Sequence, residues 1–172
     1  MNSKNYIYQL IEAGEHQQQD FKFEISDARK IAKTLSAFSN TDGGRLLVGV
    51  KDNGKIAGIR SEEEIYMIEA AAKLYCHPQI DCQMNVHQVE GRTVLEVIVS
   101  PGKQKPYYAK DTNNKGWAYI RIKDENILAT PVHLKIWQQE GTPKGSFIHY
   151  SEQEQLLMDY LDSHTQITLN QY

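Results

Sequence analysis

Residues 103 to 123 interleave cations with aromatic rings. The cations of this stretch are Lys103, Lys105, Lys110, Lys115, Arg121 and Lys123, and the rings are Tyr107, Tyr108, Trp117 and Tyr119. On a surface that binds nucleic acid, cations hold the phosphates and rings stack on the bases. A solvated strand face with a hydrophobic underside has a similar composition. The segment therefore predicts either a nucleic-acid surface or an ordinary exposed strand.

Two other motifs suggest chemistry less specifically. Gly43 and Gly44 would let backbone amides approach a phosphate. However, the sequence contains no G-x-x-x-x-G-K-[S/T], and these glycines follow a predicted helix, so we expect them to end that helix. The possible zinc ligands are Cys76, His77, Cys82 and His87. Their spacing fits no standard finger, so we expect reduced thiols without a metal.

The composition is that of a globular protein with one principal domain. The chain has 172 residues, of which 40% are hydrophobic and 24% charged, and its formal net charge is −3. An acidic balance gives no global positive field, so any nucleic-acid surface must be a local patch. There is no apolar run of 18 residues and no signal-peptide core, so we expect a cytoplasmic protein with no membrane partner.

Hydrophobic periodicity predicts alternating helices and strands around these residues. Helices are expected at 5–12, from Ser26 or Asp27 to Phe38, from a capping box at Ser61 to Tyr75, and at 132–139 after an N-cap at Thr130. Strands are expected at 20–25, 46–50, 82–89, 92–99, 107–109 and 117–122. The alternation in 20–25 predicts Phe21, Phe23 and Ile25 on one face. The pattern predicts a single α+β domain with a mixed β-sheet packed against helices.

The C-terminal part of the sequence is organised differently. We expect a domain over 1–140, a linker over 141–150 and a helical fragment over 151–172. Ser151 and Glu154 form a second capping box, and Thr168 is placed to begin another helix. This segment resembles the start of a winged helix-turn-helix, so we expect the native product to continue past Tyr172.

Three segments together resemble one known family. Ala37 to Gly58 reads AFSNTDGGRLLVGVKDNGKIAG and resembles the signature of the Schlafen AlbA-like family, once described as divergent AAA. Glu15 to Lys22, EHQQQDFK, is similar to the family's E-S-x-x-x-E-F-K. Pro106-Tyr107 and Tyr119-Ile120-Arg121 match its P-Y followed by Y-x-R. The resemblance covers residues 15 to about 130 and implies the fold and a nucleic-acid-binding function.

The resemblance also implies a candidate catalytic site. Schlafen members include endoribonucleases with three acidic residues, which correspond here to Glu15, Asp20 and Asp52. His16 replaces the family's serine, and Asp20 replaces its second glutamate. Glu15 and Asp20 differ in strand parity, so Glu15 must lie in the loop that enters the strand. Three such carboxylates would suit Mg²⁺ or Mn²⁺. The alternative is that all three are solvated surface acids and that Asp52 only forms a turn.

We therefore expect a nucleic-acid-binding module, most simply a DNA-binding part of a cytoplasmic protein that regulates transcription. The expected phosphate contacts are Lys22, Arg45, Lys103, Lys105, Arg121 and Lys123. The alternatives are a metal-dependent endoribonuclease, and a nucleotide-binding or protein-interaction module. Family members with two copies of the domain enclose nucleic acid between them. Since this chain has one copy, we expect a two-fold homodimer.

Overall fold

The computed structural model describes residues 3–140, 150–164 and 166–168 and divides into two compact units, Met1–Glu140 and Gly141–Tyr172. The helices of the first unit are α1 (Ser3–Ala13), α2 (Ala28–Asn40), α3 (Glu63–Lys73) and α4 (Pro131–Gln139). Its strands are β1 (Gln19–Lys22), β2 (Gly44–Val48), β3 (Cys76–His77), β4 (Cys82–Val89), β5 (Arg92–Val99), β6 (Tyr108–Lys110), β7 (Gly116–Ile122) and β8 (Glu125–Leu128).

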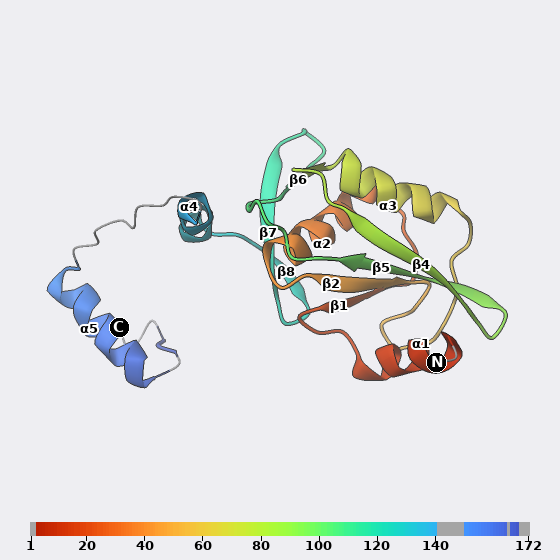
Figure 1. Ribbon diagram of the computed structural model, residues 1–172, viewed down its shortest axis with the longest axis horizontal. Helices are drawn as coiled ribbons and strands as arrows, with labels where there is room; N and C mark the ends of the chain where they lie inside the picture. The colour runs from red at the N-terminus through yellow and green to blue at the C-terminus, as the bar shows by residue number, and fades with distance from the viewer. Residues whose placement is uncertain (1–2, 141–149, 165, 169–172) are drawn as a thin grey trace. The chain divides into compact units, whose positions relative to one another are not determined.

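The strands of the first unit form two four-stranded sheets (Figure 1). The first has the order β1-β2-β5-β4, in which β1 and β2 are parallel and the other neighbours antiparallel. The second has the order β3-β6-β7-β8 and is antiparallel throughout. The predicted α+β class with a mixed sheet is therefore confirmed.

Helix α2 packs against both sheets, and it does so in two different ways. Toward the first sheet it presents Ile31, Leu35 and Phe38, which join the main hydrophobic core. Toward the second sheet it presents polar side chains. The Asn40 amide donates to the carbonyls of Tyr107 (2.8 Å) and Tyr119 (2.9 Å) and accepts from the Tyr107 N–H. Buried amides are costly unless bonded, so these contacts fix the second sheet to the helix.

Helix α1 covers part of the opposite face of the first sheet. Its Ile7 packs with Phe21, Leu47 and Val94 in a second, smaller core. The central strand β2 is thus buried on both sides, because Leu46 belongs to the main core and its neighbour Leu47 to the smaller one. A continuous apolar run is what such a strand requires.

Most sequence-predicted elements of this unit are confirmed, with three corrections. The run 20–25 is a strand only as far as Lys22; Phe23 is exposed, and Ile25 joins the main core, on the other side of the sheet from Phe21. The predicted capping box at Ser61 does not form: its hydroxyl accepts from the N–H of Glu63 (3.3 Å), and Glu64 accepts from the N–H of Arg60 (2.9 Å). Strands β3 and β8 were not predicted.

The second unit contains helix α5 (Glu152–Ser163), and its predicted capping box at Ser151 is present. Most of the predicted linker, and the helix expected after Thr168, lie outside the described residues. Among the helices described in either unit, none is long and apolar enough to cross a membrane.

Candidate functional site

Three cations lie over three aromatic rings along one side of the second sheet. The Arg29 guanidinium lies 4.4 Å from the ring centre of Tyr75, Lys33 Nζ lies 5.8 Å from that of Tyr119, and Lys115 Nζ lies 4.1 Å from that of Trp117. Distances below about 6 Å are those of cation–π contacts. We call these six residues the cation–aromatic band.

The band is assembled from three separate parts of the chain. Arg29 and Lys33 are one helical turn apart on α2, so they share a face. Trp117 and Tyr119 alternate along β7 and therefore share a face of the second sheet. Tyr75 follows α3 and accepts from the backbone N–H of Lys110 (2.8 Å), which attaches it to the edge of β6.

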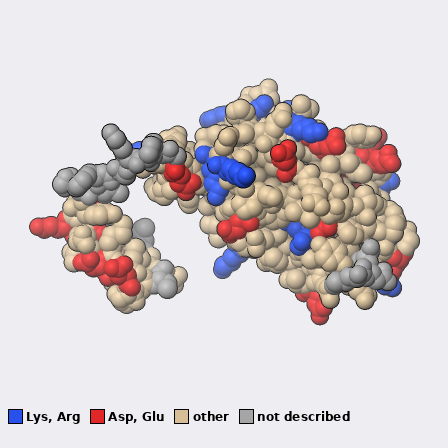
Figure 2. Space-filling model, in the orientation of Figure 1, with Lys and Arg blue, Asp and Glu red and all other residues tan. Residues whose placement is uncertain are grey.

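Parts of the band remain available to a ligand. Lys33 and Lys115 are exposed, and the three rings are half-buried. Arg29 is half-buried. Asp111 orients the band by accepting from the Trp117 indole N–H (2.9 Å). In Figure 2, Lys and Arg side chains gather over the part of the first unit that carries β6 and β7.

The expected phosphate contacts do not share one surface. Lys103 and Lys123 are exposed, and Lys105 Nζ lies 3.5 Å from the carbonyl oxygen of Thr41. Lys22 Nζ is paired with Asp20 at 2.7 Å. Arg45 Nε is paired with Glu96 at 2.5 Å, on the face of the first sheet opposite the main core.

Arg121 differs most from its expected role as an exposed contact. Its side chain is 1% exposed, and its guanidinium donates to Asp20 (3.1 Å), to the side chain of Asn126 (3.0 Å) and to the Gln19 carbonyl (3.2 Å). A guanidinium with these partners inside the protein cannot reach phosphate. Arg121 therefore joins β7 to β1.

The three candidate acids are only partly brought together. Glu15 lies in the loop before β1, as expected, and accepts from the backbone N–H of Phe21 (2.8 Å). Burial raises the pKa of Glu15, and the neighbouring Asp20 carboxylate raises it further. Asp20 is 4% exposed and binds both Arg121 and Lys22. Asp52 is exposed in the turn closed by Gly54, as the structural alternative predicted.

These acids do not fit a three-carboxylate metal centre. Two cations already bind the oxygens of Asp20, and no group of three or more His, Cys, Asp or Glu in the described residues is placed to hold an ion. Among the described residues, Cys76 and Cys82 likewise belong to no group of three or more possible zinc ligands. Burial raises the pKa of both thiols to about 12. At Gly43, the backbone N–H bonds the Phe38 carbonyl (2.9 Å), which ends α2 as predicted.

A second buried acid, Glu96 on β5, has hydrogen-bond partners for both of its carboxylate oxygens. Its Oε1 accepts from the Tyr6 hydroxyl (2.7 Å) and from Arg45, and its Oε2 accepts from Asn85 (3.1 Å) and contacts His87 Nε2 (2.9 Å). Burial alone would raise the pKa of Glu96, but these hydrogen bonds outweigh it and hold the pKa below its usual range. We call these five residues the Glu96 cluster.

Sequence reasoning missed several residues of the site. Arg29, Lys33 and Tyr75 were not among the expected contacts, although the spacing of the first two on a predicted helix places them together. Tyr75 carried no signal, because only the fold brings it to β6. The Glu96 cluster was missed as well, since its members come from α1 and three strands.

Two solved structures are similar to this chain, and the first of them supports the fold. The crystal structure of the DIP2311 protein from Corynebacterium diphtheriae is 21% identical, with a TM-score of 0.54, over 74% of this chain and 25% of that one. This chain thus corresponds to a quarter of that protein's length. The solution structure of the N-terminal domain of a RecG-related protein from Nitrosomonas europaea is 23% identical, with a TM-score of 0.49, over 87% and 99% of the two chains.

A search among curated proteins gave no significant match. The model of one protein family, described as Schlafen, AlbA_2, matches residues 15–130. This range contains the three motifs that carried the resemblance, and it spans most of the chain. The chain therefore belongs to the Schlafen, AlbA_2 family.

Proposed function

We propose that this chain binds nucleic acid through the cation–aromatic band, with Lys103, Lys105 and Lys123 as further phosphate contacts. The observation that carries the proposal is the pairing of three cations with three half-buried rings drawn from separate segments. Cations in such an arrangement hold phosphates, and rings stack on unpaired bases. Membership in a family that includes nucleic-acid-binding proteins supports it.

The charge distribution fits a local interface. The formal net charge is −3, so attraction to a polyanion depends on where the cations lie. Arg45 and Arg121 are left out, because their charges are already paired with Glu96 and Asp20.

The test is a salt titration of binding with a matched pair of double variants. Replacing Lys33 and Lys115 by alanine should weaken binding to a labelled mixed-sequence strand and lower the slope of log K against log salt by about two at most. Replacing Lys55 and Lys73, exposed lysines outside the band, removes the same charge and should change the slope much less. Equal effects of the two pairs would contradict the role of the band.

We also propose that two copies associate. Exposed apolar side chains support this on β7, β8 and α4, namely Ile122, Ile127, Leu128, Val132 and Ile136. Ile122 and Ile127 share one face of the β7–β8 pair, and exposed apolar patches are typical of association surfaces. Light scattering after gel filtration should give twice the monomer mass for the parent and the monomer mass for Ile127→Lys. A monomeric parent would contradict the dimer and leave the binding proposal intact.

The last part of the proposal is that the chain binds DNA in the regulation of transcription and that α5 is the start of a winged helix. Helix α5 supports this part only through its capped start and its apolar residues Leu156, Leu157 and Leu161. Competition between single-stranded DNA and RNA of the same sequence for the full chain measures which polymer is preferred. Tighter binding of RNA would contradict the DNA assignment.

A further inference from the structure

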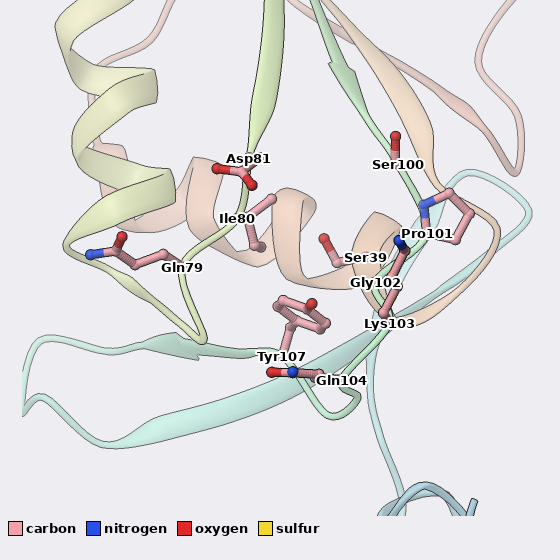
Figure 3. A pocket seen from close by; sticks show the side chains of 10 residues that line it. All are labelled: Ser39, Gln79, Ile80, Asp81, Ser100, Pro101, Gly102, Lys103, Gln104 and Tyr107. Atoms are coloured by element: carbon pink, nitrogen blue, oxygen red, sulfur yellow. The ribbon is translucent and has the colours of Figure 1, made fainter. Parts of the chain in front are cut away.

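A cavity of about 350 Å³ opens beside the cations of the loop that follows β5. Its polar lining comes from α2, from the segment before β4 and from the loop between β5 and β6, and it includes Ser39, Gln79, Asp81, Lys103, Gln104 and Tyr107. Figure 3 shows the Tyr107 ring between Ser39 and Gln104, with Asp81 on one side of the cavity and Lys103 on the other. Cavities of this size are typical of sites for small organic ligands.

The cavity is lined by a hydroxyl, a carboxylate and an ammonium group, from Ser39, Asp81 and Lys103. Ser39 is 1% exposed and lines the cavity from α2. The carboxylate of Asp81 and the ammonium of Lys103 are exposed and form no ion pair with a described residue. The charges of Asp81 and Lys103 are therefore available to a ligand in the cavity, which fits a site with a few convergent polar groups.

The aromatic wall of the cavity is fixed in place. The backbone of Tyr107 is bonded on both sides, since its N–H donates to Asn40 and its carbonyl accepts from Ser36 (2.7 Å) and Asn40. Its ring lies directly against Gly102, where a Cβ atom would overlap the ring. The Gly102 N–H in turn bonds the Ser39 carbonyl (2.8 Å). A ring held this firmly offers a stacking surface at little entropic cost.

We propose that this cavity binds one unpaired nucleobase that carries an exocyclic amine, together with its phosphate. Tyr107 stacks on the base, Asp81 accepts from the amine, and Lys103 holds the phosphate. Enzymes and binding modules that take single bases combine these same three elements, namely a ring, an edge-reading polar group and a cation. The proposal rests on the proposed nucleic-acid-binding function and adds a base-specific site to it.

Cytosine and uracil make the sharpest probes, because they have the same size and differ in an amine against a carbonyl at position 4. An aspartate accepts from the cytosine amine and repels the uracil oxygen. Three fluorescent strands of equal length are compared with the full chain: oligodeoxycytidine, oligodeoxyuridine and an abasic strand with the same phosphates. We expect oligodeoxycytidine to bind about ten-fold more tightly than the abasic strand, with oligodeoxyuridine between them.

Asp81→Asn should reduce the preference for cytosine over uracil to about one. Glu63→Gln, an equal charge change on an exposed acid of α3, should leave the preference unchanged. The change in the ratio of the two affinities distinguishes recognition of the base from general electrostatic attraction. Removing a negative charge should strengthen binding to any polyanion alike, whereas an amide that can accept from the cytosine amine or donate to the uracil oxygen should abolish the difference between the two bases. Neither acid is buried, so both variants should fold.

The outcomes distinguish the two proposals. Equal binding of all three strands by the parent would overturn the base site and leave phosphate binding through the band in place. No binding of any strand at low salt would overturn the band itself. Competition by free cytidine monophosphate identifies the source of the base. Full displacement of the strand at low millimolar concentration would assign the cavity to a free nucleotide, and resistance would assign it to a base within a strand.

Discussion

Glu96 and Glu15 are both carboxylates beside the first sheet, and their surroundings have opposite effects. Glu96 accepts from Tyr6, Arg45 and Asn85 and contacts His87, and its pKa is lowered. Glu15 lies beside a second acid, Asp20, and its pKa is raised. An acid with matched donors stabilises a fold, whereas crowded acids are more typical of functional sites. The comparison indicates that the Glu96 cluster stabilises the fold, whereas the ionised carboxylate of Glu15 does not.

The largest expected effect comes from removing the matched acid. Glu96→Ala leaves Arg45 and the donors around it without their acceptor, so the free energy of unfolding should fall by about 3 to 5 kcal/mol. Urea denaturation followed by circular dichroism measures this change. Glu125→Ala, on the exposed edge strand β8, is the control and should change it by less than about 0.5 kcal/mol. A similar loss in both variants would contradict the structural role of Glu96.

A smaller loss is expected for Asp20→Asn. The amide keeps an acceptor for Arg121 but removes the charge, and Lys22 is exposed enough to return to water. The free energy of unfolding should fall by about 2 kcal/mol, since hydrogen bonds to charged groups contribute roughly that much. An unchanged melting temperature would show that Asp20 behaves as a solvated acid.

Glu15→Gln should have the opposite sign. Because the pKa of Glu15 is raised in the folded protein, its ionised form destabilises the fold, and the favourable contribution is lost as pH rises through the folded pKa. The neutral amide should therefore raise Tm at pH 7, while its carbonyl still accepts from Phe21. Calorimetry at pH 7 and pH 4 measures the effect, and the gain should shrink at the lower pH. A lower Tm at pH 7 would contradict the conclusion that Glu15 and Glu96 have opposite effects on stability.

The smallest expected effect is on the stability of the parent protein at acid pH. Since the pKa of Glu96 is lowered on folding, its contribution is present above the unfolded pKa and is lost as pH falls through the folded pKa. Between pH 7 and pH 5 this residue should therefore change stability very little. Below about pH 4, near the ordinary value for glutamate, the stability of Glu96→Gln should fall less steeply than that of the parent.

Much of the fold followed from local sequence signals. The β4–β5 hairpin was predicted at its observed bounds from the two-residue turn Glu90-Gly91, and in the structure both residues adopt the positive φ that such a turn requires. Strand β8 was missed because the turn before it uses Lys123 at φ 57, a residue that carries no turn signal. Phe23 was wrongly placed in the strand because alternating apolar and polar residues do not show where the partner strand ends. Pairing with β2 ends at Lys22 and Val48.

The site was less predictable than the fold. The six expected cations were chosen for charge, but charge does not show which cations already have partners. Arg121 pairs with an acid 101 residues earlier, and Arg45 with one 51 residues later, so no local pattern reveals either. Residues that depend on one element, such as Arg29 and Lys33, could have been grouped from helical spacing.

The pairing of Asp20 with Arg121 also bears on the order in which the protein forms during synthesis. Parallel strands β1 and β2 and the helix between them are complete once residue 48 has left the ribosome. Of the two cations that bind Asp20, Lys22 is then present, but the buried one, Arg121 on β7, is made about 70 residues later. At roughly 5 to 20 residues per second, several seconds separate the two events. During that interval the nascent first sheet holds a carboxylate whose buried partner does not yet exist. Stable closure of this sheet is therefore expected only after β7 emerges, which makes the second sheet a late and necessary step of folding.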